Sequence, residues 1–201
     1  SSSLSDNLSR TPLHALHLEL NAKMVPFAGY EMPLQYPAGL MAEHLQTRKS
    51  AGLFDVSHMG QLRLTAKSGD VRDAALALET LVPVDIVGLA PYRQRYGFLT
   101  NAQGGIMDDL MIANMGDWLF VVVNAACKHE DIAHIEAAIG DRVTVERLDD
   151  RALLALQGPQ AVDVIAGLCP AAAQMRFMDP IATEIAGVPC PLSRSGERRG
   201  G

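Results

Sequence analysis

Residues 96–110, YGFLTNAQGGIMDDL, place an apolar run on each side of a polar turn that contains Gly104 and Gly105. Two apolar runs around a glycine-containing turn are typical of a β-hairpin. Two adjacent carboxylates, Asp108 and Asp109, follow the turn directly. Neighbouring side chains of a strand point to opposite faces, so both cannot face water if the sheet is covered on one side. We therefore predict that one of them lies against a core or a pocket, and we treat the pair as a candidate functional site.

The segments around this hairpin predict an α+β plait. Apolar residues recur with the period of a strand in some segments and with that of a helix in others. Strands are expected at residues 53–66, 93–100, 106–114, 118–124 and 142–147, and helices at residues 70–81 and 126–139. The resulting order β-α-β-β-β-α-β is close to the ferredoxin-like pattern, with one extra antiparallel strand.

The two ends of the chain predict shorter elements. Thr11, followed by proline, predicts the N-cap of a helix, and residues 38–49 predict a second helix that Gly52 ends as its C′ residue. Three prolines and a glycine confine residues 24–37 to an edge strand or a short extended piece. Near the other end we expect a strand at residues 151–157, a helix from Pro159 to about residue 168, and a hairpin over residues 185–192 that turns at residues 186–187.

These end segments have no obvious partner sheet of their own. We therefore predict that residues 1–51 and 148–201 together form one discontinuous α+β domain with an antiparallel sheet. The plait, residues 52–147, is then an insertion in that domain.

Composition limits the partners of the chain. Its 201 residues carry a net charge of −6, and 48% of them are apolar. The sequence has no basic cluster, which argues against nucleic acid as a partner, and no apolar run reaches the ~20 residues of a membrane span. The three dispersed cysteines form no C-x-x-C pair and predict free thiols in a reducing compartment. The stretch SSSLSDNLSR lacks the apolar core of a secretory signal. We therefore expect a cytoplasmic protein and favour this location over the mitochondrial matrix.

Several common catalytic motifs are absent from the sequence. His129-Glu130 is followed by His134, one residue too far for H-E-x-x-H, and no phosphate-binding glycine loop or G-x-S-x-G is present. Ser57 and His58 point in opposite directions in a strand, and no spacing suggests a metal site.

The remaining candidates are the aspartate pair, Met59 and Asn124. From the residues alone, an aspartate of the pair could satisfy backbone N–H groups near the turn, Met59 could belong to the core, and Asn124 could be a turn residue. The functional alternative is a desolvated carboxylate that binds a ring N–H or handles a proton, because desolvation raises the pKa of a carboxyl group.

Six motifs in order resemble one family. They are RTPL at 10–13, MVPFAGYEMPLQY at 24–36, LFDVSHMGQ at 53–61, TNAQGGIMDDL at 100–110, VVVNAAC at 121–127 and LQGPQA at 156–161. The chain resembles the T-protein of the glycine cleavage system, the tetrahydrofolate-dependent aminomethyltransferase, over nearly its whole length up to Gly196. The resemblance covers only about the first half of a family member. It implies an antiparallel domain built from both chain ends, an inserted plait, and a C-terminal barrel that is missing here.

The resemblance also implies chemistry. In this family the lipoyl group of a partner, the lipoylated H-protein, carries an aminomethyl unit. The co-substrate tetrahydrofolate takes the carbon as 5,10-methylenetetrahydrofolate, and ammonia leaves. The catalytic aspartate of the family falls on Asp109. The folate-binding residues fall on Met59, Tyr96, Asp109 and Asn124, and Asp108 becomes a solvated or backbone-capping partner.

The sequence departs from the family after Gly196. A family tyrosine of the folate site would align with Glu197, and we therefore expect a truncated, weakly active or inactive fragment. Two alternatives remain. One is a non-catalytic folate-binding module, and the other is a different folate-dependent enzyme of the superfamily, such as a demethylase or a domain of a sarcosine- or dimethylglycine-oxidising enzyme.

Overall fold

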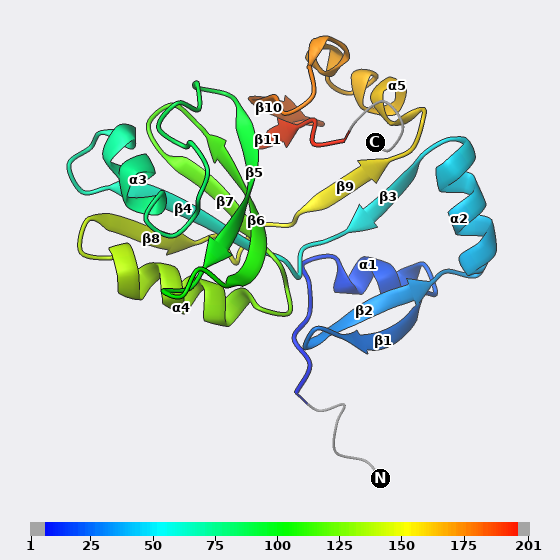
Figure 1. Ribbon diagram of the computed structural model, residues 1–201. Coiled ribbons are helices and arrows are strands. Elements are labelled where there is room, and N and C mark those ends of the chain that lie inside the picture. Colours follow the sequence, from blue (N-terminus) through cyan, green and yellow to red (C-terminus); the bar gives the residue numbers. More distant parts are fainter. Residues whose placement is uncertain (1–6, 197–201) are drawn as a thin grey trace. The chain divides into compact units, whose positions relative to one another are not determined.

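The computed structural model describes residues 7–196, and Figure 1 shows the order of the elements. The helices are α1 (His14–Glu19), α2 (Leu40–Lys49), α3 (Val71–Leu78), α4 (Lys128–Ile139), α5 (Ala161–Ala166) and the 3-10 helix η1 (Pro170–Gln174). The strands of the first half are β1 (Lys23–Phe27), β2 (Tyr30–Gln35), β3 (Gly52–Asp55), β4 (Gly60–Ala66) and β5 (Gln94–Thr100). Those of the second half are β6 (Ile106–Asn114), β7 (Leu119–Val123), β8 (Val143–Arg147), β9 (Leu154–Gln157), β10 (Pro180–Ile185) and β11 (Val188–Ser193).

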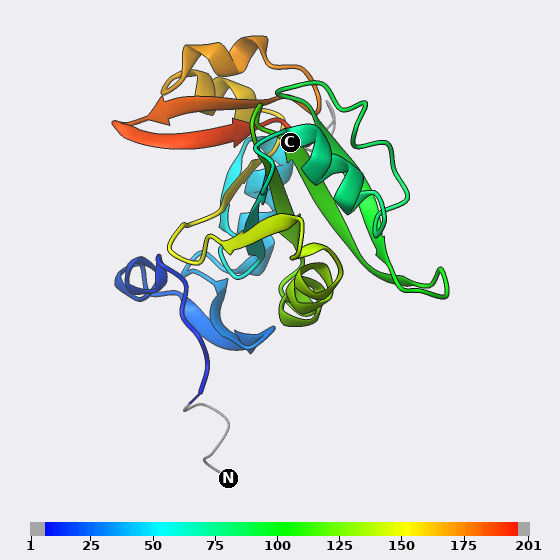
Figure 2. The same ribbon diagram turned by 90° about the vertical axis from the view of Figure 1, so that its left-hand side faces the viewer.

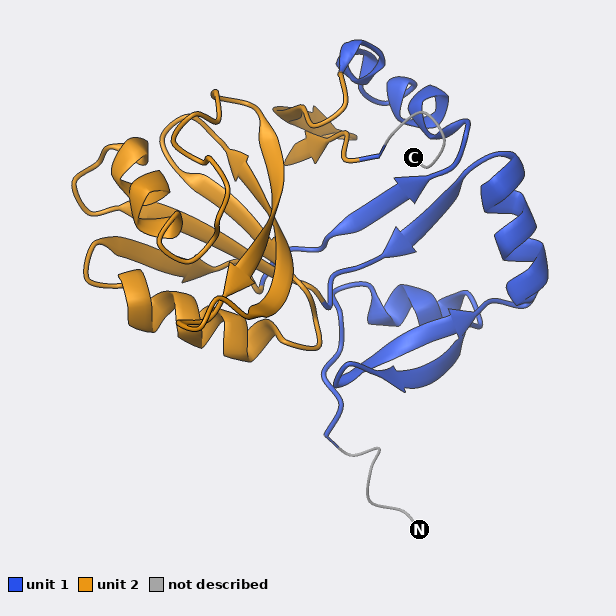
Figure 3. Ribbon diagram, viewed as in Figure 1, with its two compact units in different colours: residues 1–58, 150–175, 196–201 blue, residues 59–149, 176–195 orange. Residues whose placement is uncertain are grey.

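The described residues form two compact units, which Figure 3 distinguishes by colour. Unit 1 takes the described residues of 1–58, 150–175 and 196–201, and unit 2 takes residues 59–149 and 176–195. Each unit is described by itself below.

Unit 2 contains a five-stranded antiparallel sheet with the strand order β5-β6-β7-β4-β8. The part β8-β4-β7-β6 has the ferredoxin-like order, and β5 is the extra edge strand. Figures 1 and 2 show α3 and α4 on one side of this sheet. The predicted ferredoxin-like plait with an extra antiparallel strand is therefore confirmed.

The core of unit 2 explains why its sequence folds in this way. Leu62 and Leu64 of β4 alternate with polar residues and are fully buried, and Leu78 of α3 and Ile135 of α4 meet them in the same cluster. Burial of such side chains contributes roughly 1.5–3 kcal/mol each. Asp70 caps α3 by accepting the backbone N–H of Arg72 at 2.9 Å. The amphipathic pattern thus places both helices on one face, and the described residues of unit 2 place no helix on the other face of the sheet.

Unit 1 joins distant parts of the chain. β1 and β2 form an antiparallel hairpin, and β3 pairs antiparallel with β9, about a hundred residues later. Gly158 follows β9 with a φ of +121°, a conformation that favours glycine. A Cβ atom there would lie 2.4 Å from the carbonyl oxygen of Ser50, so the backbone approaches α2 more closely than a side chain would allow.

The hairpin of β10 and β11 turns at Ala186 and Gly187, as predicted. From sequence we assigned it to the discontinuous domain, whereas residues 176–195 here belong to unit 2. This segment interacts with the start of β5 and with the residue before it: Gln94 donates its backbone N–H to the carbonyl of Met178 at 3.0 Å, and Arg93 forms an ion pair with Asp179. The predicted domain boundaries themselves stay a prediction.

Three local predictions were wrong. Thr11 does not cap α1, whose N-cap position is Leu13; its hydroxyl instead donates to Asp55 Oδ2 at 2.7 Å. Gly52 is not the C′ residue of α2 but the first residue of β3. Residues 53–66 form two strands, β3 and β4, because β3 pairs with β9 whereas β4 pairs with β7 and β8.

Within residues 7–196, none of the helices is both long enough and apolar enough to cross a membrane. The same residues contain no group of three or more histidine, cysteine, aspartate or glutamate side chains that could hold a metal ion.

Candidate functional site

The candidate residues meet at one end of the five-stranded sheet, within unit 2. Asp109 lies opposite Phe98 in the β5–β6 register, and Leu110, the next residue, lies opposite Val123. Asn124 follows Val123 directly. The register therefore brings Asn124 beside Asp109, although they are 15 residues apart in sequence.

Met59 lies at the same end of the sheet. It precedes Gly60, which pairs with Val123. Its side chain is half-buried, so Met59 is neither fully buried in the core nor fully exposed to solvent.

The two aspartates lie on different faces of the sheet. Asp108 is opposite Leu99, which is fully buried, so it points toward the face that α3 and α4 cover. Asp109 is opposite Phe98, which is 42% exposed, so it points toward the other face. The prediction that one carboxylate lies against the core is confirmed, and the residue is Asp108. Asp108 is half-buried on this face of the sheet.

Asn124 links the two carboxylates. Its Nδ2 donates to Asp108 Oδ1 at 2.9 Å and to Asp109 Oδ1 at 2.7 Å. A side-chain amide has two N–H donors and can serve two acceptors in this way. Asp108 Oδ1 also accepts the backbone N–H of Asp109 at 2.9 Å, so the expected capping of a backbone group is present.

Tyr96 completes the contacts of Asp109. Its hydroxyl donates to Asp109 Oδ2, so each carboxylate oxygen of Asp109 has a donor. This hydrogen bond, together with desolvation and the charges of both aspartates, raises the pKa of Tyr96 above its usual value. The structure therefore brings Tyr96, Asp109 and Asn124 into direct contact.

An aromatic pair lies beside Asp109 on the face of the sheet opposite α3 and α4. The rings of Tyr96 and Phe98 meet edge to face, with centroids 5.5 Å apart and an interplanar angle of 81°. Tyr96 is 45% exposed, so part of each ring remains accessible. Exposed aromatic surface next to a fixed carboxylate suits a flat heteroaromatic ligand that carries N–H donors.

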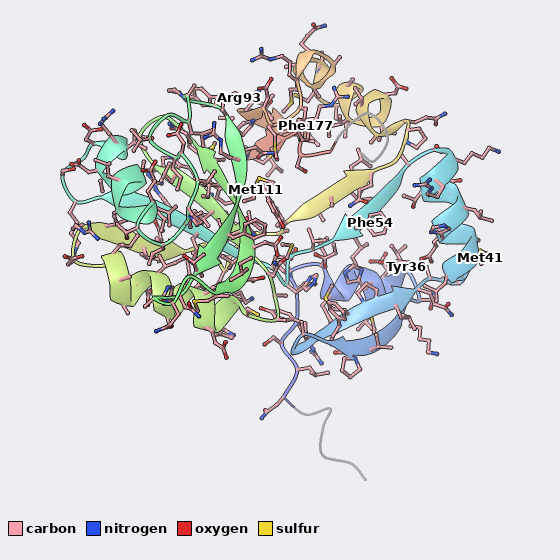
Figure 4. All side chains as sticks on the ribbon, in the orientation of Figure 1. Tyr36, Met41, Phe54, Arg93, Met111 and Phe177 are labelled. Atoms are coloured by element: carbon pink, nitrogen blue, oxygen red, sulfur yellow. The ribbon has the colours of Figure 1, made fainter. Side chains whose placement is uncertain are left out.

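A cavity of about 510 Å³ adjoins this pair in unit 2. Tyr96, Arg95, Arg93, Phe177 and Met178 contribute to its lining. Figure 4 labels Arg93 and Phe177, and the guanidinium of Arg93 donates to the carbonyl of Phe177 at 3.2 Å. The cavity therefore extends the aromatic surface toward two cationic side chains.

The sequence did not point to Asp131 of α4, although it lies under the candidate site. Asp131 is 1% exposed, and Asp108 is among the groups that shift its pKa. Burial and interactions with Asp108, Glu130 and Asp109 raise the pKa of Asp131 to about 7. The helical spacing offered a clue, because Asp131 is four residues before Ile135 and thus on the apolar face of α4.

The pKa of Asp108 is shifted in the opposite direction. Burial alone would raise it, but hydrogen bonds from Asn124, Asp131 and the backbone hold the pKa below its usual value. Two coupled carboxyl groups with diverging pKa values are characteristic of a pair that shares one proton.

A second polar cluster, also missed from sequence, lies in unit 1. His17 Nε2 contacts Asp55 Oδ2 at 2.8 Å, and His17 Nδ1 contacts the hydroxyl of Tyr36 at 2.6 Å. Burial would raise the pKa of Asp55, but hydrogen bonds from Ser57, Thr11 and His17 outweigh it and lower the pKa. The cluster joins α1 to β3 and to the residue that follows β2.

The family model described as the GCVT N-terminal domain matches residues 13–196. The chain therefore belongs to this GCVT family. The mitochondrial aminomethyltransferase of Dictyostelium discoideum is 44% identical to this GCVT domain over 96% of the chain and 49% of the relative. The aminomethyltransferase of Deinococcus deserti is 47% identical over 79% of the chain and 43% of the relative.

Solved structures agree with this family. The crystal structure of the glycine cleavage system aminomethyltransferase T from Bartonella henselae matches 88% of the chain and 48% of that protein, with 37% identity and a TM-score of 0.81. A heterotetrameric sarcosine oxidase from Corynebacterium matches with 21% identity and a TM-score of 0.58, which shows a shared fold alone.

The GCVT domain spans about half the length of the curated relatives it matches. The part of a family member that would form the expected C-terminal barrel is not covered by this chain. Glu197, where the sequence departs from the family, lies outside the described residues. The relatives include mitochondrial and bacterial proteins, so the cytoplasmic location stays a prediction.

Proposed function

We propose that this GCVT domain carries the tetrahydrofolate-facing side of an aminomethyltransferase of the glycine cleavage system. The observation that carries the proposal is the fixed carboxylate of Asp109, which Tyr96 and Asn124 hold on the face of the sheet opposite α3 and α4, beside exposed aromatic surface. Transfer of a carbon between two bound carriers depends on positioning more than on acid–base strength. A preorganised carboxylate of this kind supplies such positioning.

Each residue has a role in this proposal. Asp109 accepts a hydrogen bond from an N–H of the folate and orients a ring nitrogen as the nucleophile. Tyr96 and Met59 form walls for the flat pterin, and Asn124 holds Asp109 in place. The fit is supported by the surroundings of Asp109, because the same face offers both an anionic acceptor and accessible rings.

The proposed reaction transfers one methylene carbon. The donor is an aminomethyl unit on a lipoyl sulfur of an H-protein. Two new C–N bonds form to the folate nitrogens while the C–S and C–NH₂ bonds break. The two N–H protons of the folate end on the released thiol and on ammonia, so atoms balance without an oxidant. The lipoylated H-protein is thus the proposed partner.

Isothermal titration of the 201-residue chain with tetrahydrofolate tests the binding part. We expect Asp109→Asn to weaken binding at least ~10-fold, because a hydrogen bond to a charged group contributes about 1.5–3 kcal/mol. Asp117→Asn removes the same charge in an exposed turn and serves as the matched control. Equal affinity of the Asp109→Asn variant and the wild type would remove Asp109 from its role.

An assay with aminomethyl-lipoyl H-protein tests the transfer part. Release of ammonia that depends on tetrahydrofolate would support an aminomethyltransferase. Folate binding without such release would instead favour a folate-binding module that lacks transferase activity.

A further inference from the structure

We propose that Asp131 is a positioning residue for Asp109: its protonated carboxyl group donates a hydrogen bond to Asp108 and thereby fixes the Asn124 amide that holds Asp109. This inference rests on the proposed function only for the folate-binding role of Asp109. The protonated pair itself is independent of any ligand.

The first argument is the surroundings of two oxygen atoms. Asp108 Oδ2 and Asp131 Oδ2 are buried and find no donor among the described residues. Asp131 is almost fully inaccessible, so water does not replace that donor. A buried acceptor without a donor destabilises the fold, and more so when it is charged. A single proton between the two carboxyl groups supplies the missing donor.

The second argument is the charge around Asp131. Asp108 faces it from β6, and the charge of Asp109 acts on it from the other face of the sheet. Glu130 precedes it on α4, and Cys127 is the N-cap residue of that helix. Lys128, a buried cation one turn earlier on α4, makes an interaction of its own. Burial and the charges of Asp108, Glu130 and Asp109 raise the pKa of Asp131 to about 7, whereas the pKa of Asp108 is lowered. The proton of the pair therefore resides on Asp131.

The third argument is the route from Asp131 to the site. Asp108 uses Oδ1 to accept the Asn124 amide at 2.9 Å, and the same nitrogen of Asn124 donates to Asp109 at 2.7 Å. Asp108 is thus held on one side by Asp131 and on the other by Asn124. When Asp131 ionises, two negative charges repel each other across the pair, and Asp108 is displaced from the geometry that Asn124 requires.

Two variants separate positioning from simple packing. Asp131→Ala removes the donor and is expected to weaken tetrahydrofolate binding roughly 10-fold by titration calorimetry at pH 6. Asp131→Asn keeps a donor at every pH, because its amide can bind Asp108 without a titratable proton. We expect it to recover most of the affinity that Asp131→Ala loses and to abolish the decline of wild-type affinity between pH 6 and pH 8.

The protonated carboxyl group can be observed directly. Infrared spectra of the wild-type chain at pH 6 should show a carboxylic acid band that disappears at pH 8 and is absent from Asp131→Asn. Absence of that band from the wild type at pH 6 would overturn the proposal, even if Asp131→Ala did not fold.

The outcomes also separate this inference from the proposed function. If Asp109→Asn weakens binding but Asp131→Ala binds as the wild type does, the positioning role of Asp131 is wrong. If the band is present and Asp109→Asn leaves the affinity unchanged, the carboxyl pair exists and the folate role of Asp109 is wrong.

Discussion

Tyr96 contributes to the candidate site in two ways, through its ring and through its hydroxyl group. The ring packs against Phe98, and the hydroxyl donates to Asp109. Tyr96→Phe separates the two contributions because it keeps the ring and removes the donor. We expect a three- to tenfold loss of tetrahydrofolate affinity, since a partly exposed hydrogen bond to a charged group is weaker than a buried one. Titration calorimetry measures the effect.

Tyr92→Phe is the matched control for this prediction. Tyr92 is also half-exposed, and no hydrogen bond of its hydroxyl to Asp109 exists in the described part of the chain. Removal of the Tyr92 hydroxyl group should leave the affinity for tetrahydrofolate unchanged. Equal losses in both variants would show that the hydroxyl of Tyr96 does not act through Asp109.

The carboxyl pair predicts how stability depends on pH. In the unfolded chain both groups titrate near 3.8, whereas folding raises the pKa of Asp131 to about 7. Between these values the folded state binds one proton more than the unfolded state, so the contribution of Asp131 to stability falls as pH rises. The pKa of Asp108 is lowered, so its contribution to stability falls as pH decreases below 3.8. The unfolding free energy of Asp131→Asn should therefore increase relative to the wild type between pH 5 and pH 8.

Urea denaturation at several pH values measures this difference. Glu184→Gln, on an exposed residue of β10, provides a control of the same chemistry. A difference between Asp131→Asn and the wild type that stays constant with pH would show that Asp131 does not titrate in this range.

Local sequence rules account for part of the site. Alternation along the strand predicts that Asp108 and Asp109 separate, and the structure brings Tyr96, Asp109 and Asn124 together. Which aspartate faces the core depends on where α4 packs, and that is a non-local property. Asp131 is not predictable from sequence for the same reason, because a carboxylate of α4 resembles a solvated residue until its partner is known.

Gly158 shows how one residue constrains the β3–β9 pair and α2. Its φ is +121°, and a Cβ atom would lie 2.4 Å from the carbonyl oxygen of Ser50 and 2.6 Å from that of Thr47. These neighbours are backbone atoms, so they cannot rotate away. We expect Gly158→Ala to lower the free energy of unfolding by at least about 2 kcal/mol. Thermal or urea denaturation measures it.

Gly167→Ala is the comparison for this prediction. Gly167 follows α5 in the same unit with a φ of −64°, and the nearest atom to a new Cβ would be 3.4 Å away. Its effect should stay within about 0.5 kcal/mol, as for ordinary surface changes. A loss at Gly167 as large as that at Gly158 would contradict the close-approach argument.

The sequence predicts the type of an element where a periodic pattern extends over many residues. It does not predict the boundaries of elements where the chain passes from one unit to the other. The hairpin of β5 and β6 and both helices of the plait follow from periodicity. Residues 53–66 look like one strand because the apolar pattern is continuous. This segment is divided because its first part pairs with β9 and its second part pairs with β7 and β8. These partner strands lie far away in sequence.

The buried apolar residues are distributed unequally between the two units. The main core cluster extends from Leu62 to Val143 and therefore lies in unit 2. Among the described residues of unit 1, the buried apolar side chains are Met32, Ala161, Cys169, Ala172 and Met175. No residue of α2 is buried, and Met41 on this helix is 70% exposed and labelled in Figure 4. Hydrophobic burial thus stabilises unit 2 far more than unit 1.

This difference predicts that the units open separately. Unit 1 is held by polar contacts such as His17–Asp55 and by two-stranded pairings, whose backbone groups are protected less than those of a five-stranded sheet. In native-state hydrogen exchange, amides of β1, β3 and β9 should exchange at least ~100-fold faster than those of β4 and β7. Asp55→Asn should widen the gap, because it weakens the buried contact to His17, whereas Asp73→Asn, at an exposed position of α3, should not. Uniform protection across both units would mean that they unfold as one cooperative body and that the apolar core of unit 2 does not determine their relative stability.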